Sequence, residues 1–325
     1  MALLSIVVPV YREERNISEF VAHVTSVLRT VTDDYEIIFA LDPSPDGSEE
    51  AILRARQTDP RVKMLKFSRR FGQPMSTLAG LRYAAGEAVI VMDVDLQDPP
   101  ELIPEMMAKW REGYDVVYAQ RRRRAGETAA KKLVAWLAYR AIRRLSEVDI
   151  PPNTGDFRLM SRRVVDELNR LKEGHGFLRG MVALVGFRQT CLLFDRPARF
   201  SGPGNYNRFL GSIRIGINGL VCFSGKLLSF LSVAGALLIA AAVVLAVACA
   251  FMEAFGTGCP IDHPVLLAAI LFLAGVQLLG MGLLGEYVSR IYDEVKGRPK
   301  FIVDRAEGFD AVPPAGDDGP RRSGP

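Results

Sequence analysis

Two carboxylates one residue apart, Asp93 and Asp95, have the types and spacing for chemistry. They follow an apolar run in "VIVMDVDLQDPPEL", residues 89–102. Alternate side chains of an extended segment point to the same face, so the two carboxylates can converge. Such a pair suits a hard cation, because Mg²⁺ commonly uses one or two protein carboxylates and takes its other ligands from water and substrate phosphates. The spacing therefore indicates metal-assisted binding of a phosphorylated substrate.

Two further acids occur in comparable settings. Asp42 is the first polar residue after the apolar segment "EIIFAL", and Asp156 lies in the Gly-containing segment "PPNTGDFRLMSRR". Either acid alone is more typical of a turn or a helix cap than of catalysis. The cysteines argue against other chemistry, since they have no C-x-x-C spacing for a zinc site and no disulfide pattern (Cys191, Cys222, Cys249 and Cys259).

The elements that must position these acids alternate along residues 1–205. Short apolar runs predict strands at 4–11, 35–41, 62–67, 88–93 and 115–119, and helical periodicity lies between them, at 17–28, 49–58, 74–84 and 100–110. This alternation predicts an α/β domain with a mainly parallel sheet covered by helices on both faces. Ligands of such sheets bind at the carboxyl ends of the strands, where Tyr11, Asp42, Asp93 and Asp95 fall.

Residues 227–252 and 264–284 are two long apolar segments, each able to cross a bilayer core of about 20 helical residues. A pair of buried core helices is the alternative, which the lack of charge disfavours. The connecting loop, 253–263, has no Lys or Arg, whereas the flanking segments carry several. Positive-inside bias then puts the 1–205 domain and both termini in the cytoplasm, at the bacterial inner membrane. The N-terminal residues lack the basic region of a signal peptide.

Other segments are predicted around these spans. Residues 128–145 form a basic amphipathic helix with aromatic residues, which suits a membrane surface; a helix packed on the domain with a solvated basic face is the alternative. Residues 206–226 form a second amphipathic helix leading into the first span. Residues 285–305 are expected to be cytoplasmic, and the Pro/Gly/Asp-rich tail 306–325 to be disordered. The net charge of +4 is too small to indicate nucleic-acid binding.

The motifs resemble those of the inverting GT-A glycosyltransferases of family 2, in the branch that acts on polyprenyl phosphates. That branch includes bactoprenol glucosyltransferases and dolichol-phosphate mannose synthases. The segments that carry the resemblance are "SIVVPVYREE", "EIIFALDPSPDGS", "FSRRFGQ", "VIVMDVDLQDPPELIPEM", "GYDVVYAQRRRRAGE", "NTGDFRLMSR" and "GMGLLGEYVSRIYDEVKGRPKFIV". They cover residues 4 to about 305, and the two spans make the likeness greatest to the bactoprenol enzymes.

The resemblance implies a role for individual residues. Asp95, assisted by Gln97, would bind Mg²⁺ or Mn²⁺. The nucleotide-sugar site would comprise Pro9, Tyr11, Glu13, Asp42, Asp93, Val94, Arg121 and Arg124. The acceptor phosphate would lie at Arg158, Arg199 and Asn205. The donor would be a UDP-sugar rather than a GDP-sugar, the acceptor undecaprenyl phosphate in the lipid bilayer, and the assembly a possible homo-tetramer through the spans.

Asp156 occupies the family position of the catalytic base, and we assign it as catalytic with its role open. A phosphate monoester has a second pKa of about 6, so the acceptor is already largely an anionic nucleophile at neutral pH. Asp156 could instead orient the acceptor or the sugar hydroxyls. The reaction expected is a single in-line displacement that inverts the anomeric carbon.

The chain departs from the family pattern in two places. Asn205 stands where relatives usually carry Lys, and Pro43 and Pro45 stand where they carry Gly and Thr. These departures support one alternative, a membrane-anchored scaffold with a degenerate transferase head. A processive polysaccharide synthase is a further alternative, but it would need more spans and a Gln-x-x-Arg-Trp motif. A flippase-like role is disfavoured because the spans hold no ionisable relay.

Overall fold

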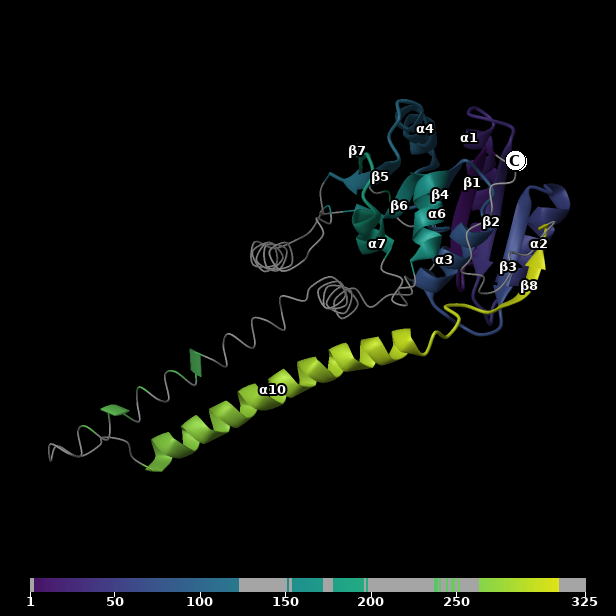
Figure 1. Ribbon diagram of the computed structural model, residues 1–325. Coiled ribbons are helices and arrows are strands. Elements are labelled where there is room, and N and C mark those ends of the chain that lie inside the picture. The colour runs from purple at the N-terminus through teal and green to yellow at the C-terminus, as the bar shows by residue number, and fades with distance from the viewer. Residues whose placement is uncertain are drawn as a thin grey trace, which may run out of the picture.

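The computed structural model describes residues 3–122, 151, 154–171, 178–195, 197, 263–309 and seven positions from 237 to 251. The predicted amphipathic helices at 128–145 and 206–226, the predicted loop up to residue 262 and most of the predicted first span lie outside the described residues. The described residues form an α/β head and one long helix (Figure 1).

One eight-stranded sheet organises the head, in the order β7-β5-β6-β4-β1-β2-β3-β8. The central strands β1, β2, β3 and β4 run parallel, whereas β6 runs antiparallel to both β4 and β5, and β8 antiparallel to β3. The strands are β1 (Leu4–Val10), β2 (Tyr35–Leu41), β3 (Val62–Phe67), β4 (Ala88–Val91), β5 (Val116–Arg121), β6 (Thr154–Ser161), β7 (Gln189–Phe194) and β8 (Val303–Glu307). The five predicted strands are confirmed, and β6, β7 and β8 are additional.

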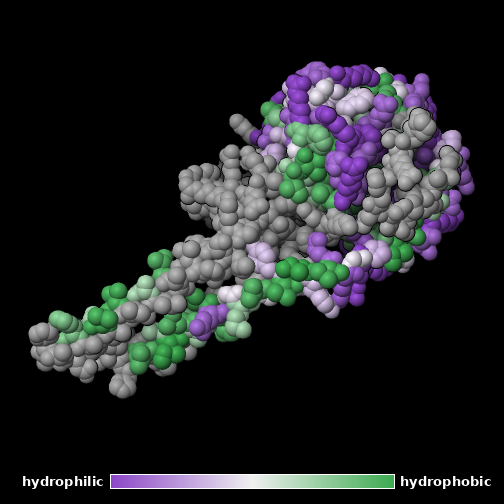
Figure 2. All heavy atoms as spheres, viewed as in Figure 1, coloured by the Kyte–Doolittle hydropathy of each residue, from purple (hydrophilic) through white to green (hydrophobic). Residues whose placement is uncertain are grey.

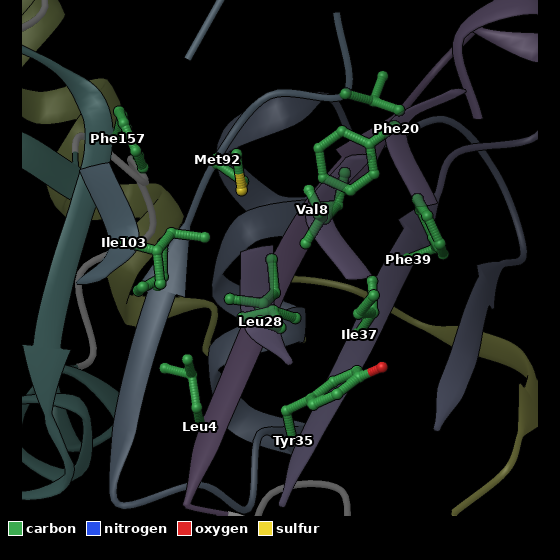
Figure 3. Close-up of a cluster of buried hydrophobic side chains, with 14 of the residues drawn as sticks. Leu4, Val8, Phe20, Leu28, Tyr35, Ile37, Phe39, Met92, Ile103 and Phe157 are labelled. Carbon is green, nitrogen blue, oxygen red and sulfur yellow. The ribbon is translucent and has the colours of Figure 1, made fainter. Parts of the chain in front are cut away.

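Helices cover both faces of this sheet, as predicted (Figure 1). They are α1 (Glu14–Leu28), α2 (Ser48–Thr58), α3 (Gln73–Tyr83), α4 (Ile103–Arg111) after the short 3₁₀ turn η1 (Pro100–Leu102), α6 (Arg162–Arg170) and α7 (Leu178–Val185). Alternation along β1 explains the two layers: Ile6 and Val8 pack with α1, α2 and α4, whereas Val7 packs with α3, α6 and α7. Figure 3 shows the first layer, where Phe20 of α1 meets Phe39 of β2 edge to face, with ring centroids 5.9 Å apart.

Pro9 occupies a position in β1 where a missing N–H costs no ladder bond. The carbonyl of Val7 accepts the N–H of Met92 beyond β4 (3.1 Å), and the carbonyl of Val10 accepts the N–H of Asp42 beyond β2 (3.0 Å). Alternate residues of β1 thus face β4 and β2, and Pro9 faces β4. The β1–β4 ladder is already at its end there, because its last pair is Val7 with Val91. Proline is tolerated in strands only where no donor is required.

The antiparallel strand β6 brings a distant segment to the carboxyl end of β4. Val91 pairs with Arg158 in that ladder, and Ile90 with Leu159. The same register continued by two residues sets Asp156 opposite Asp93. The start of β6 therefore lies at the edge of the sheet where β1, β2 and β4 end.

Helix α10 (His263–Val295) contains the predicted second span, 264–284. It is the single helix of the described residues that is long and apolar enough to cross a membrane, by length and composition. Figure 2 shows apolar side chains along much of it and a largely hydrophilic surface on the head. Its 33 residues correspond to about 50 Å, which is longer than the hydrocarbon core of a bilayer, about 30 Å.

After α10 the chain returns to the head and completes the sheet. The carbonyl of Ile302 accepts the N–H of Ser68 (3.1 Å), and β8 then pairs with β3. Phe301 packs near Phe67, with ring centroids 6.2 Å apart, and Phe309 meets Tyr83 edge to face at 5.3 Å. The predicted boundary of the disordered tail at 305/306 is therefore too early, because β8 continues to Glu307 and Phe309 packs against Tyr83.

Asp115, at the start of β5, joins β5 to β6 and α6. This buried carboxylate accepts hydrogen bonds from the guanidinium of Arg163 and from the hydroxyl of Ser161 (3.0 Å). The hydrogen bonds from Arg163 lower the pKa of Asp115 below its ordinary value, against the opposing effect of burial.

This lowered pKa predicts an acid-dependent loss of stability. Because the folded pKa lies below the unfolded one, the stabilisation is complete above the unfolded pKa and is lost as the pH falls through the folded value. We expect Asp115→Asn to lower the free energy of unfolding by on the order of 1–2 kcal/mol at pH 7. Below about pH 4 the difference in unfolding free energy between the variant and the wild type should become smaller. Unfolding midpoints of both proteins between pH 7 and 3 measure this. A difference that stays constant over this range would contradict the assignment.

Candidate functional site

Asp42, immediately after β2, is buried and fixes the loop that follows β3. Its two carboxylate oxygens accept the backbone N–H groups of Phe71 and Gly72, each at 2.9 Å. Gly72 has φ +89°, a left-handed conformation that favours glycine, and α3 starts at the next residue. These two bonds orient the start of α3 against the end of β2.

The loop after β4 carries Asp93 and Asp95 and is held by its own side chains. Asp98 accepts the N–H of Asp93 (3.1 Å), and Asp95 accepts the N–H of Gln97 (3.1 Å). Leu96 has φ +58°, uncommon for a residue with a Cβ atom. Gln73 from the start of α3 donates its side-chain N–H to Asp93 (2.8 Å). The carboxylate pair is thus preorganised by the loop and by α3.

The loop after β1 is bound to the loop after β2. The N–H of Arg12 donates to the Ser44 hydroxyl (2.9 Å), and the N–H of Glu13 donates to the Ser48 hydroxyl (3.0 Å). Pro43 and Pro45 flank Ser44, one of these two acceptors, so the unusual prolines stiffen this loop without removing its contacts. Tyr11 lies at the start of the first loop, and the guanidinium of Arg70 stacks 3.9 Å from its ring centroid.

Asp156 lies at the start of β6 among arginines. Arg179 of α7 donates its Nε–H to Asp156 Oδ1 (3.0 Å), and Arg158 donates to the carbonyl of Gly155 (2.7 Å). Burial alone would raise the pKa of Asp156, but the charges of Arg179, Arg158 and Arg121 lower it below its ordinary value. Burial lowers the pKa of Arg158 to about 10, so Arg158 is still protonated at neutral pH.

The remaining predicted residues fall partly within the described chain. Arg121 ends β5, and its guanidinium lies close to Gly155, where a Cβ atom would stand 3.3 Å from Arg121 Nη2. Val94 is buried between the two acids of the loop. Gln97 donates its side-chain N–H to the carbonyl of Pro197 (3.3 Å). Arg124, Arg199 and Asn205 lie outside the described residues.

The donor set at the loop after β4 fits Mg²⁺ or Mn²⁺. Asp93, Asp95 and the Gln97 amide are oxygen donors, which hard cations prefer. Within the described ranges there is no group of three or more acidic, histidine or cysteine side chains placed to hold a metal ion. A cation at this loop would therefore need further oxygen ligands from a bound substrate or water, which is the usual arrangement of Mg²⁺ with phosphates.

Sequence reasoning missed three side chains of this site. Gln73 and Arg70 lie in "FSRRFGQ", directly after a predicted strand, and their position at a strand end was a usable signal. Arg179 had no such signal in the sequence, because it lies on α7 and the periodicity of the sequence did not predict that helix.

The comparisons with known proteins establish the class. The model of glycosyl transferase family 2 matches residues 5–168, and the chain belongs to this family. An uncharacterized glycosyltransferase of Synechocystis sp. is 42% identical over 321 residues, covering 95% of this chain and 97% of the relative. The bactoprenol glucosyl transferase of Shigella phage SfII is 38% identical over 304 residues, covering 93% and 98%.

Solved structures of similar chain path include the glucosyl-3-phosphoglycerate synthase of Mycobacterium tuberculosis in complex with Mg²⁺ and uridine diphosphate. Its sequence identity is 14% and its TM-score 0.44, and the alignment covers 68% of this chain and 77% of the synthase.

Proposed function

We propose that this glycosyltransferase transfers a sugar from a UDP-sugar to undecaprenyl phosphate at the cytoplasmic face of the bacterial inner membrane. The proposal rests on one observation: the site and the chain leaving α10 lie at the same end of the sheet. Asp42, Asp93 and Asp156 lie at the end of the sheet where the parallel strands finish, and the chain leaving α10 contacts Ser68 at that same end. Six residues lie between Val295 and Ile302, so the reach is at most about 25 Å.

A short connection of this kind suits a lipid acceptor. A polyprenyl chain gains about 0.8 kcal/mol for each CH₂ group kept in the bilayer, so the enzyme must meet its phosphate at the membrane surface. The connection keeps the carboxyl ends of the strands near the end of α10. The names of the bactoprenol relatives support the same acceptor.

The donor would lie across the carboxyl ends of β1, β2 and β4. Tyr11, Glu13 and Asp42 would line the uridine, with Pro9 and Val94 shaping the strand ends beneath. Asp95, assisted by Gln97, would hold Mg²⁺ or Mn²⁺ at the diphosphate, Asp93 would contact the nucleotide, and Arg121 would add charge at the diphosphate. When bound, the metal ion acts as a Lewis acid that stabilises the charge of the departing diphosphate.

The transfer needs no proton movement at the acceptor. An oxygen of the acceptor phosphate forms the new bond to the anomeric carbon, while the bond from that carbon to the diphosphate breaks and its electron pair leaves with the nucleoside diphosphate. The configuration at the carbon inverts. Because the pKa of Asp156 is lowered and a phosphate monoester is largely ionised at pH 7, a general base is not required.

The test is turnover by the purified full chain in detergent with undecaprenyl phosphate and Mn²⁺. The donors would include UDP-glucose, UDP-N-acetylhexosamines and GDP-mannose, and mass spectrometry would detect a glycosylated lipid phosphate. A metal-dependent product from a UDP-sugar is the expected result. Nucleotide binding without a product from any donor would instead support the scaffold hypothesis, and a product from GDP-mannose alone would contradict the assignment of the donor.

A further inference from the structure

Asp156 lies in a cluster of arginines at the edge of the sheet where the parallel strands end. The charges of three guanidinium groups, those of Arg179, Arg158 and Arg121, act on this carboxylate. Guanidinium groups gathered in this way are suited to bind a further anion, such as a phosphate.

Arg158 forms the buried side of the cluster. The residue is 3% exposed, and its Nε–H has no hydrogen-bond partner among the described residues. An unsatisfied charged donor at this depth is costly, so a bound anion nearby would recover part of the energy. The bond from Arg158 to the carbonyl of Gly155 fixes the guanidinium beneath Asp156.

Arg179 forms the accessible side. Its side chain is 31% exposed and that of Asp156 is 32% exposed, so both can be reached from solvent while Arg158 cannot. Arg179 is the second residue of α7, and Leu178, Met181 and Val182 of that helix are buried in the core. The backbone of Arg179 is therefore held firmly, and the Nε–H bond to Asp156 directs the rest of its guanidinium. A guanidinium has five N–H donors in a planar fork that matches phosphate oxygens.

The order of strands in the sheet indicates which phosphate this cluster would bind. Asp42 follows β2, Tyr11 follows β1, and Asp93 and Asp95 follow β4. Asp156 is the third residue of β6, which is the strand next to β4 in the sheet. A donor laid along this edge would place its nucleoside at β2 and β1 and its diphosphate at β4. The anomeric carbon and the attacking group must then lie farther on, toward β6.

We propose that Arg179 binds the acceptor phosphate, and that Asp156 positions Arg179 for this contact. This inference rests on the proposed function, because it needs a phosphate as the acceptor. It gives Asp156 a defined role: the carboxylate keeps the Arg179 fork oriented toward the acceptor, and Arg158 supports the cluster from below.

The first experiment compares Arg179→Gln with the wild type in the turnover assay. We expect the KM for undecaprenyl phosphate to rise on the order of 10- to 100-fold, the scale for losing a charge-assisted contact. The KM for the nucleotide sugar, and the affinity for UDP with Mn²⁺ by calorimetry, should stay within about twofold. Arg179→Lys keeps the positive charge without the planar fork, and its acceptor KM should lie between those of the wild type and Arg179→Gln. The matched control is Arg170→Gln, which removes an exposed arginine paired with Glu167 and should leave both KM values unchanged.

The second experiment tests the role of Asp156. Asp156→Asn should raise the acceptor KM about as much as Arg179→Gln, and the double variant should add little, since both changes disable one contact. The pH profile of kcat should stay flat between pH 7 and 9 in the wild type and in Asp156→Asn, because the second pKa of the acceptor phosphate, about 6, lies below this range.

Several results would overturn the inference. A rise in the donor KM alone, or an unchanged acceptor KM in both Arg179 variants, would show that Arg179 does not bind the acceptor. A kcat loss of about a thousandfold in Asp156→Asn with an unchanged acceptor KM would indicate a general base instead. These outcomes require an active wild type; a wild type that glycosylates no lipid phosphate refutes the proposed function itself.

Discussion

Asp95→Asn is expected to lower kcat/KM by about 10³-fold, the largest catalytic effect in this chain. Asn keeps the shape of Asp and can still accept the N–H of Gln97, so the loop after β4 should remain folded. What is lost is the negative charge that would hold the cation, and with it about 4 kcal/mol of stabilisation of the departing diphosphate. Turnover at saturating Mn²⁺ and the affinity for UDP with and without Mn²⁺ measure the effect.

The control for this variant is Glu101→Gln. Glu101 is an exposed acid a few residues after Asp95, and its side chain pairs with His23. It should retain nearly full activity. The proposed site would be wrong if Asp95→Asn kept a metal-stimulated rate close to the wild type, or if both variants lost activity equally.

Removing the segment after α10 should give the largest loss of stability. A chain ending at Pro299 lacks β8 together with Phe301 and Phe309, which leaves the edge of β3 unpaired and the ring of Phe67 uncovered. Phe301 and Phe309 are partly buried, so each contributes less than the ~3–5 kcal/mol of a fully buried aromatic side chain. Together with the lost pairing of β8, we expect a loss of several kcal/mol. The exposed edge of β3 should also favour aggregation.

A chain ending at Phe309 is the matched control, because it keeps all of these contacts and removes only the terminal residues 310–325. It should unfold at the wild-type temperature. Hydrogen exchange locates the effect: the amides of β3 and α3 should lose protection in the shorter chain and keep it in the control. Equal protection in the two truncated chains would contradict the role of β8.

The shorter chain should also lose activity. Phe67 meets Phe71 edge to face, with centroids 6.1 Å apart, and the N–H of Phe71 is bound by Asp42. The contact of Phe301 with Phe67 thus supports the loop at the proposed nucleotide site. We expect weaker binding of UDP in the chain that ends at Pro299.

Local patterns in the sequence determined the central part of the fold. The strands β1 to β5 and the helices between them were predicted because each is a short, strongly apolar or periodic segment joined to its neighbour by a brief loop. Parallel strands with right-handed crossovers leave few arrangements open. For the same reason Asp42, Asp93 and Asp95 could be placed at one edge of the sheet, and they lie there.

The tertiary structure alone decided how distant segments complete this sheet. The strand β6 enters antiparallel between β4 and β5, which carries Asp156 to the register position opposite Asp93 and brings Arg179 to it. The strand β8, "VDRAE", is too polar to be recognised as a strand, yet its backbone pairs with β3 more than 200 residues earlier in the chain. Pairing of this kind depends on backbone hydrogen bonds and on a free sheet edge, and neither leaves a periodic pattern in the sequence. The amino-acid sequence by itself therefore specified the carboxylates and the strands that bear them, while the position of Arg179 beside Asp156 and the return of the chain from α10 were fixed only by the folded sheet.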